Sequence, residues 1–273
     1  MNGVIRGTVL LCVFGTVASC AEIGTNPDEP AAIELTALPS PSVVIGDTLR
    51  NESGLVAPVR ATVLNVRGAV IADASIRYLY ADLRRDTALV VDSLTGVIRA
   101  LRASTGDARV VARVGGSLQV LRVLVITTRP DSLERNAQPL PLFSTTLPDT
   151  GRVRAAANTS PVFTATVRHA DAITGGSGVN AWLVRYELLK PANPGNDTTA
   201  AVFLVDDTGR TSVLDTTDAN GSAGRKVRIR ATAFPSIPTD SVIVRATATY
   251  RGKTLAGAPV RFALPVARGA PTP

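Results

Sequence analysis

The stretch ARVVARVGGSLQVLRVLVIT, residues 108–127, decides the fold. In its first half Val110, Ala112 and Val114 share one face of an extended chain, and arginines alternate with them. This period of two predicts a half-buried strand. Gly115-Gly116 separates the strand from the next apolar run, which predicts a β-hairpin.

Short apolar runs separated by turn residues continue on both sides of this hairpin. Before it the runs are IELTAL, SVVIGDTL, APVRATVLNV, ASIRYLYAD, TALVVDS and GVIRALRA. After it they are SPVFTATV, NAWLVRYELLK, AAVFLVD, TSVLDTT, RKVRIRATAF, DSVIVRATATY and APVRFALPV. Runs of this length and spacing are typical of β-sandwiches, so the sequence predicts an all-β protein.

One segment, DASIRYLYADLRR, fits two periods. Ile76, Leu79 and Leu83 are spaced as on one side of a helix, whereas Ile76, Tyr78 and Tyr80 share one face of a strand. The strand is the interpretation we adopt, because aromatic side chains suit a pleated surface and the neighbouring runs are strands.

The run pattern occurs twice along the chain. PVRATV at 58–63 parallels PVFTATV at 161–167, and IRYLY at 76–80 parallels VRYEL at 184–188. Residues 129–160, rich in Pro, Thr, Ser and Asn, are expected to hold a domain boundary and an irregular first strand, PLPLFST. The sequence therefore predicts a diverged duplication of one architecture.

The N-terminus has the layout of a secretory signal peptide. A single charge at Arg6 precedes the apolar run Val9–Phe14, and small residues lead to Cys20. Val17-Ala18-Ser19-Cys20 resembles the lipobox of bacterial lipoproteins, in which the cysteine is acylated and becomes the mature N-terminus. Cys12 lies in the segment that would be removed, so an intrachain disulfide is not expected. An ordinary secretion signal with an incidental cysteine stays open as the alternative.

The first copy resembles the group 2 bacterial immunoglobulin-like domains. The resemblance lies in VVIGDTL, RATV and VVDSLTGVIRALRASTGDARVVARVGG, with Gly46, Gly96 and Gly106 at the turn positions of the family. The second copy resembles the invasin and intimin type through VFTATVRHADAITGGSGVNAWLVRYELLKP, TTDANGSAGRKVRIRA and DSVIVRATATY. These resemblances imply two tandem antiparallel immunoglobulin-like sandwiches that serve as exported spacers or adhesion modules, and they carry over no functional residue.

The expected organisation follows from these features. It is a signal peptide at 1–19, a lipid-anchored tether at 20–32, one domain at 33–128, a second at 129–267 and a tail at 268–273.

The formal charge of +7 comes from 29 basic and 22 acidic residues, and only three of the basic residues are lysines. An anionic envelope surface would attract such a chain. Nucleic acid is not an expected partner, because no basic stretch is interleaved with stacking aromatics.

A row of cations is the first candidate site. Lys226, Arg228 and Arg230 alternate with Val227 and Ile229, so they share the solvent side of a strand. Such a row suits an anionic ligand or lipid headgroups, or it is a solvated face that discourages edge-to-edge aggregation.

Trp182 and His169 are two further candidate site residues. Trp182 shares strand parity with Val184 and Tyr186, which favours a buried core position over a sugar-stacking platform. His169 is the only histidine and has no nucleophile motif beside it, so we expect it on the surface of a loop.

Carboxylates are dense in DDTG at 206–209 and DTTDANG at 215–221. A calcium ion needs six to eight oxygens, and only part of a calcium loop is present. We favour turn chemistry, with Asn-Gly closing a hairpin. The alternative, a polysaccharide hydrolase, would draw its acid pair from these residues: Asp206, Asp207, Asp215 and Asp218.

The sequence as a whole predicts a lipid-anchored cell-envelope protein that acts as a non-catalytic binding, adhesion or structural module. No cofactor or metal is expected. The partners expected are the membrane, through lipid on Cys20, and a protein or polysaccharide at the cell surface. The outer membrane is expected where the source has two membranes, because Ala21 follows the cysteine. A carbohydrate-binding module is the main alternative, and the hydrolase is the other.

Overall fold

The computed structural model describes residues 29–81, 88–104, 106–136, 140–141, 143–147, 158–171, 176–230 and 241–271. These residues form strands and turns without a helix, which confirms the all-β prediction. Within them, accordingly, no helix could cross a bilayer. The signal segment and Cys20 lie outside the described residues.

The first domain packs a four-stranded sheet, in the order β2-β8-β7-β4, against the pairs β1-β3 and β5-β6. All neighbours are antiparallel except β2 and β8. The strands are β1 (Pro30–Leu35), β2 (Ser42–Val44), β3 (Ala61–Asn65), β4 (Ile76–Tyr80), β5 (Leu89–Val91), β6 (Ile98–Ala100), β7 (Ala108–Val114) and β8 (Leu118–Thr127).

The second domain packs the sheet β10-β21-β18-β13-β14 against the sheet β12-β11-β17-β15, and a small hairpin projects from it. β16 pairs with β13 and β9 with β11. The strands are β9 (Ser132–Arg135), β10 (Phe143–Leu147), β11 (Phe163–His169), β12 (Ser177–Gly178), β13 (Leu183–Lys190), β14 (Ala192–Asn193), β15 (Val202–Val205), β16 (Leu214–Thr216), β17 (Ser222–Ile229), β18 (Ser241–Thr247), β19 (Thr249–Tyr250), β20 (Lys253–Thr254) and β21 (Val260–Pro271).

Both domains repeat one pairing order. The order β4-β7-β8 in the first domain matches β13-β18-β21 in the second, and each final strand also takes a parallel partner, β2 or β10. The antiparallel pairs β1-β3 and β9-β11 correspond in the same way. A three-stranded sheet of this order facing a second sheet is the immunoglobulin-like arrangement. The prediction of two tandem immunoglobulin-like sandwiches is confirmed, and the shared order supports a duplication.

Side-chain alternation builds each core as the sequence predicts. In β7, Val110 and Ala112 are fully buried and Val114 nearly so, and β7 and β8 form the expected hairpin through residues 115–117. In β4, Tyr78 and Tyr80 face the core of the first domain, which confirms the strand interpretation of this segment.

The two motifs that repeat in the sequence hold equivalent tyrosines. The hydroxyl oxygen of Tyr78 accepts a hydrogen bond from the Ala61 amide at 3.1 Å, and the Tyr186 hydroxyl donates to the Ala223 carbonyl at 2.7 Å. Each tyrosine therefore ties a strand of one sheet, β4 or β13, to the strands that face it. Burial raises the pKa of the Tyr186 hydroxyl far above its ordinary value, so it stays a donor.

Several boundaries differ from the sequence reading. β1 begins at Pro30, inside the expected tether, and β21 continues to Pro271, inside the expected tail. The second domain has a first strand that the sequence did not predict, β9, and β10 begins at Phe143, within the expected strand PLPLFST. Among the turn glycines, Gly46 and Gly96 have positive φ, whereas Gly106 does not.

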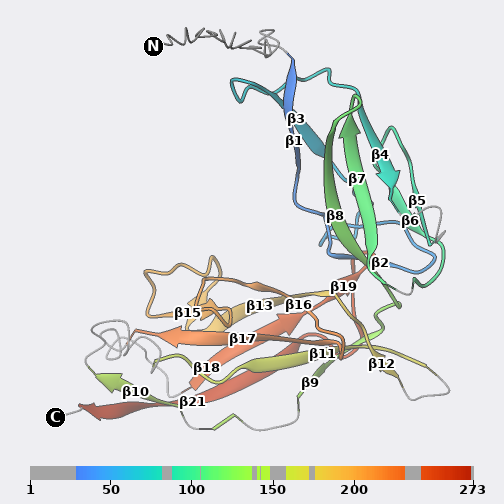
Figure 1. Cartoon of the computed structure of the whole chain (residues 1–273). Helices are drawn as coiled ribbons and strands as arrows, with labels where there is room; N and C mark the ends of the chain where they lie inside the picture. Colours follow the sequence, from blue (N-terminus) through green and yellow to red (C-terminus); the bar gives the residue numbers. More distant parts are fainter. Residues whose placement is uncertain are drawn as a thin grey trace, which may run out of the picture.

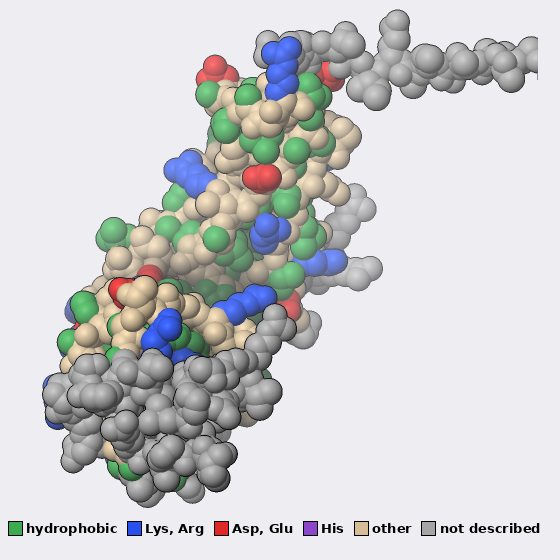
Figure 2. Space-filling view, turned by 90° about the vertical axis from the view of Figure 1, so that its left-hand side faces the viewer, with side chains coloured by type: hydrophobic (Ala, Val, Ile, Leu, Met, Phe, Trp, Pro, Cys, Tyr) green, Lys and Arg blue, Asp and Glu red, His purple; other side chains and the backbone are tan. Residues whose placement is uncertain are grey.

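The two domains meet at their ends and lie at an angle to each other, with β1 starting at the far end of the first domain and β21 finishing at the far end of the second (Figure 1). β2 and β19 lie where the domains meet. On the face in Figure 2, Lys and Arg side chains are spread along both domains.

Candidate functional site at the domain junction

Asp47, in the turn after β2, presents a carboxylate from the first domain to the second. Its amide donates to the Val44 carbonyl at 2.9 Å, and the amide of Gly46 donates to the Ala100 carbonyl at 2.9 Å. Gly46 takes φ +78°, a conformation that glycine adopts at little cost. Asp47 is only 5% exposed, so this turn holds a carboxylate largely out of water.

The second domain meets this carboxylate with the hairpin formed by β19 and β20. Tyr250 pairs with Lys253 across a two-residue loop, Arg251-Gly252. Both loop residues have positive φ, +50° and +75°, which defines a type I′ turn. This turn matches the right-handed twist of the flanking strands, so it holds Tyr250 and Arg251 in a fixed direction.

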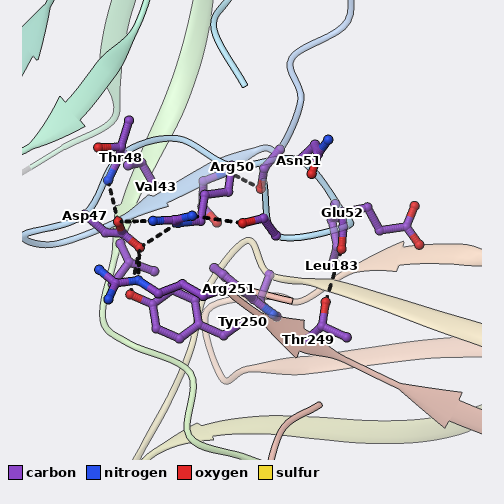
Figure 3. Close-up of a pocket in the computed structure, with 15 residues that line it drawn as sticks. Val43, Asp47, Thr48, Arg50, Asn51, Glu52, Leu183, Thr249, Tyr250 and Arg251 are labelled. Atoms are coloured by element: carbon purple, nitrogen blue, oxygen red, sulfur yellow. Dashed lines mark hydrogen bonds and ion pairs between the residues drawn. The ribbon is translucent and has the colours of Figure 1, made fainter. Parts of the chain in front are cut away.

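Four groups donate to the Asp47 carboxylate, two from each domain (Figure 3). From the second domain, the Tyr250 hydroxyl donates to Oδ2 at 2.8 Å and Arg251 Nε donates to Oδ2 at 2.9 Å. From the first domain, Arg50 donates to both oxygens at 3.0 and 3.1 Å, and the Thr48 amide donates to Oδ1 at 2.8 Å. One buried carboxylate thus joins the domains through charge-assisted hydrogen bonds.

The surroundings decide the charge state of Asp47. Burial by itself raises the pKa of the carboxyl, but the hydrogen bonds from Arg251, Arg50, Thr48 and Tyr250 together outweigh burial. The pKa of Asp47 is therefore held well below its ordinary value, and the group is ionised at neutral pH. Burial and the contact with Asp47 raise the pKa of the Tyr250 hydroxyl, which remains a donor.

Backbone also meets backbone at the junction. Gly54 has φ +80°, and a Cβ atom built on it would lie 1.9 Å from the Gly252 nitrogen. No side chain fits in that space, so the close approach of the domains depends on glycine at this position.

Asp47 and its four donors, Thr48, Arg50, Tyr250 and Arg251, form what we call the Asp47 cluster. Further polar contacts flank this cluster. The Arg185 guanidinium forms a two-point ion pair with Glu52, at 2.5 and 2.8 Å. The Thr249 hydroxyl donates to the Glu52 carbonyl at 3.1 Å, and the buried Ser42 hydroxyl donates to the Ala181 carbonyl at 2.7 Å. Contacts therefore extend along the junction on both sides of the cluster.

Trp182 lies at this junction, at the margin of the second domain's core and not fully inside it, so the prediction of a buried core position is only partly correct. It precedes β13, is half-buried, and its ring meets Tyr250 edge to face at 5.9 Å between centroids. Tyr186 occupies the core position instead, 1% exposed. The cavity that Trp182 lines encloses about 40 Å³, which has room for water and not for a sugar ring.

The row of cations lies away from the junction, with Lys226 and Arg228 on β17 and Arg230 directly after its end. Val227 and Ile229 are fully buried, which bears out the alternation. Lys226 forms an ion pair with Asp207 at 2.9 Å. Arg230 donates to the Thr198 carbonyl and lies 5.5 Å from the centre of the Phe203 ring. Arg228 lies between them on the same face and is half-buried. A ligand role for this row stays a prediction.

Asp206 and Asp218 shape turns. Each uses Oδ1 to accept backbone N–H groups two and four residues later, at 2.8 and 2.9 Å, and each turn ends at a glycine with positive φ. The expected Asn-Gly hairpin is wrong in one respect, because the flanking strands β16 and β17 belong to different sheets. Asp215 accepts from the Gly224 amide at 2.6 Å and pairs with Arg225 at 2.8 Å.

His169 is not the free loop residue that we expected. It ends β11, and its Nδ1 lies 2.8 Å from Asp131 Oδ2. Burial alone raises the pKa of Asp131, but hydrogen bonds from Ala170, His169 and Arg129 outweigh it and lower the pKa. Asp131 belongs to the segment that connects the two domains, so this pair fixes the linker to the second domain.

Among the described residues, no three His, Cys, Asp or Glu side chains converge as metal ligands would. The candidate site that the structure offers is therefore the junction itself.

Comparison with known proteins assigns no family. No family model matches the chain, and no curated protein matches it. Three similar solved structures are surface layer protein SbsC domains 1–6, Yersinia pseudotuberculosis adhesin InvE and the human Desmocollin-1 ectodomain. Their sequence identities are 12%, 12% and 11%, and their TM-scores are 0.30, 0.34 and 0.27. They cover 89%, 85% and 89% of this chain, which in turn spans 29%, 58% and 42% of theirs. Likeness at this level carries no argument about function.

Proposed function

We propose that this protein is a lipid-anchored, non-catalytic module of the cell envelope, in which two immunoglobulin-like domains act as one stiff spacer. The observation that carries the proposal is the Asp47 cluster. Its carboxylate takes hydrogen bonds from both domains, so bending at the junction would strip a buried charge of two donors. A stiff two-domain unit suits a protein that holds a binding surface at a set distance from a membrane.

The proposed lipid anchor rests on the sequence around Cys20. The proposed non-catalytic role rests on how the four aspartates that a hydrolase would need are already engaged. Asp206 and Asp218 serve turns, whereas Asp207 and Asp215 form ion pairs with Lys226 and Arg225. This arrangement favours a structural role over a hydrolase. The cavity beside Trp182 is too small for a sugar, which favours a structural or adhesion role over sugar binding at that residue.

The test uses intact bacteria that carry the full chain or a Cys20→Ser variant. We expect mass spectrometry to find acyl groups on Cys20 and residues 1–19 removed, and we expect the variant to leave the membrane fraction. Crosslinking in the same cells should attach the anchored chain to discrete envelope partners. An unmodified Cys20 thiol, or equal membrane recovery of both chains, would contradict the anchor.

A further inference from the structure

A second concave surface lies beside the junction and shares Tyr250 and Arg251 with the cavity that Trp182 lines. It is lined by the linker, through Arg129 and Asp131, and by the β19–β20 hairpin, through Tyr250, Arg251 and Lys253. Its volume is about 270 Å³. We call this surface the junction groove.

Cations outnumber acids among the side chains that line the groove, although Arg129 and Arg251 each form one ion pair, with Asp131 and Asp47. Three cations line the groove, and all are exposed. The side chain of Arg129 is 61% exposed, that of Arg251 is 52% exposed, and Lys253 is exposed as well. Asp131 is the one acidic residue among the lining residues and is 19% exposed. A concave surface with an excess of cations concentrates anions from solution.

The acidic groups near the groove are already occupied. Oδ1 of Asp131 accepts from Arg129 at 2.7 Å, and Oδ2 accepts from the Ala170 amide at 2.9 Å and faces His169 Nδ1 at 2.8 Å. Asp47 is occupied by the junction donors. Neither carboxylate is therefore available to neutralise another cation in the groove.

Donors remain for a ligand. A guanidinium has five N–H groups, and in the described part of the chain Arg129 and Arg251 each use Nε for their carboxylate. Lys253 adds an exposed ammonium with three donors. The cation row on β17 differs, because Lys226 is paired with Asp207 and Arg230 donates to the Thr198 carbonyl.

We propose that the junction groove binds a phosphate group, with Arg129, Arg251 and Lys253 as its donors. Cations that reach one space from two segments suit a tetrahedral anion with several acceptor oxygens better than a planar carboxylate, which a single arginine satisfies. The groove is below the usual size of drug-like ligand sites, which fits a small headgroup or a free phosphate. This inference goes beyond the proposed function and does not depend on the anchor.

The test is an NMR titration of the full chain in non-ionic detergent at constant pH and ionic strength. One arm uses inorganic phosphate and the other uses glycerophosphoglycerol, which is phosphatidylglycerol without its acyl chains. We expect saturable shifts of the amide signals of residues 129–131 and 250–254. Tighter binding in one arm identifies free phosphate or a lipid headgroup as the source.

Variants separate a site from general charge attraction. Lys253→Gln and Arg129→Gln should each weaken binding at least about threefold, and Lys253→Arg should retain it. Arg67→Gln removes the same charge from an exposed turn of the first domain and should leave binding unchanged. Unfolding midpoints confirm that each variant folds. Shifts that do not saturate, or equal weakening by Arg67→Gln, would overturn the proposal.

Discussion

At the scale of single residues, the ionic contacts of the junction differ in how deeply they are buried. Asp47 is 5% exposed and has donors on both oxygens, whereas the side chains of Glu52 and Arg185 are 38% and 48% exposed. An exposed ion pair contributes about 0.2–1 kcal/mol, because water and salt screen it. A buried carboxylate with charged donors contributes more, because its loss leaves cations without their partner.

Replacing Asp47 should therefore cost more than replacing Glu52. We expect Asp47→Asn to lower the free energy of unfolding by about 1–3 kcal/mol, and Glu52→Gln by less than about 1 kcal/mol. Urea unfolding of both variants measures the difference. Equal losses would show that Asp47 is not the main ionic contact.

Gly54 allows a test of the backbone contact with a matched control. Gly54 and Gly68 both have φ near +80° and both accompany an asparagine three residues earlier. A Cβ on Gly54 meets the Gly252 backbone, whereas a Cβ on Gly68 meets nothing within 4 Å. Both alanine variants should lose about 1 kcal/mol from the positive φ, and only Gly54→Ala should also separate the domains. X-ray scattering in solution measures the separation, and unchanged dimensions for Gly54→Ala would refute the contact.

At the scale of elements, alternation along a strand assigns each side chain to the core or to the solvent face. β7 is the clearest case, since Val110 is fully buried and Val111, its neighbour, is half-exposed on the outer face. The type I′ hairpin of β19 and β20 shows a second device, in which turn conformation sets the direction of two junction side chains.

A pair of isosteric substitutions tests the alternation. Val110→Thr places a hydroxyl in an apolar core and should cost about 1–3 kcal/mol of unfolding free energy. Val111→Thr leaves the hydroxyl within reach of water and should change stability by less than about 0.5 kcal/mol. Thermal unfolding distinguishes them, and a reversed order would mean that the strand faces the other way.

The sequence predicts elements better than it predicts the junction. The hydrophobic period and the turn residues were enough to predict strand β4, the β7–β8 hairpin and the correspondence between the two domains. Asp47 is more than 200 residues away from Tyr250 and Arg251 in the sequence, so no local pattern brings it to them. The glycine in Arg251-Gly252 after a strand indicates a turn, but nothing in the local sequence indicates that this turn contacts Asp47. Trp182 packs against the core as its parity predicts but stays half-buried, and it lies one residue before the start of β13.

At the scale of the whole molecule, the Asp47 carboxylate makes both the stability of the protein and the contact between its domains depend on pH. The pKa of Asp47 is lower in the folded protein than the value of about 3.9 for an unfolded chain. A lowered pKa contributes stability that is fully present above the unfolded value and is lost as the pH falls toward the folded value.

Acid should therefore weaken the junction in a defined window. Below about pH 4 the unfolded chain binds a proton at Asp47 that the folded protein does not, so the unfolding free energy should fall as the pH is lowered. The difference between the wild-type protein and Asp47→Asn isolates this effect from other carboxylates. We expect that difference in unfolding free energy to shrink between about pH 4 and pH 2. A difference that stays constant over this range would exclude Asp47 as its source.

The central claim is that the two domains form one stiff unit, and residual dipolar couplings measured by NMR test it most directly. One alignment tensor should fit the amides of both domains in the wild-type protein at neutral pH. In Asp47→Asn each domain should require a tensor of its own. Two tensors of different magnitude in the wild-type protein would contradict the account.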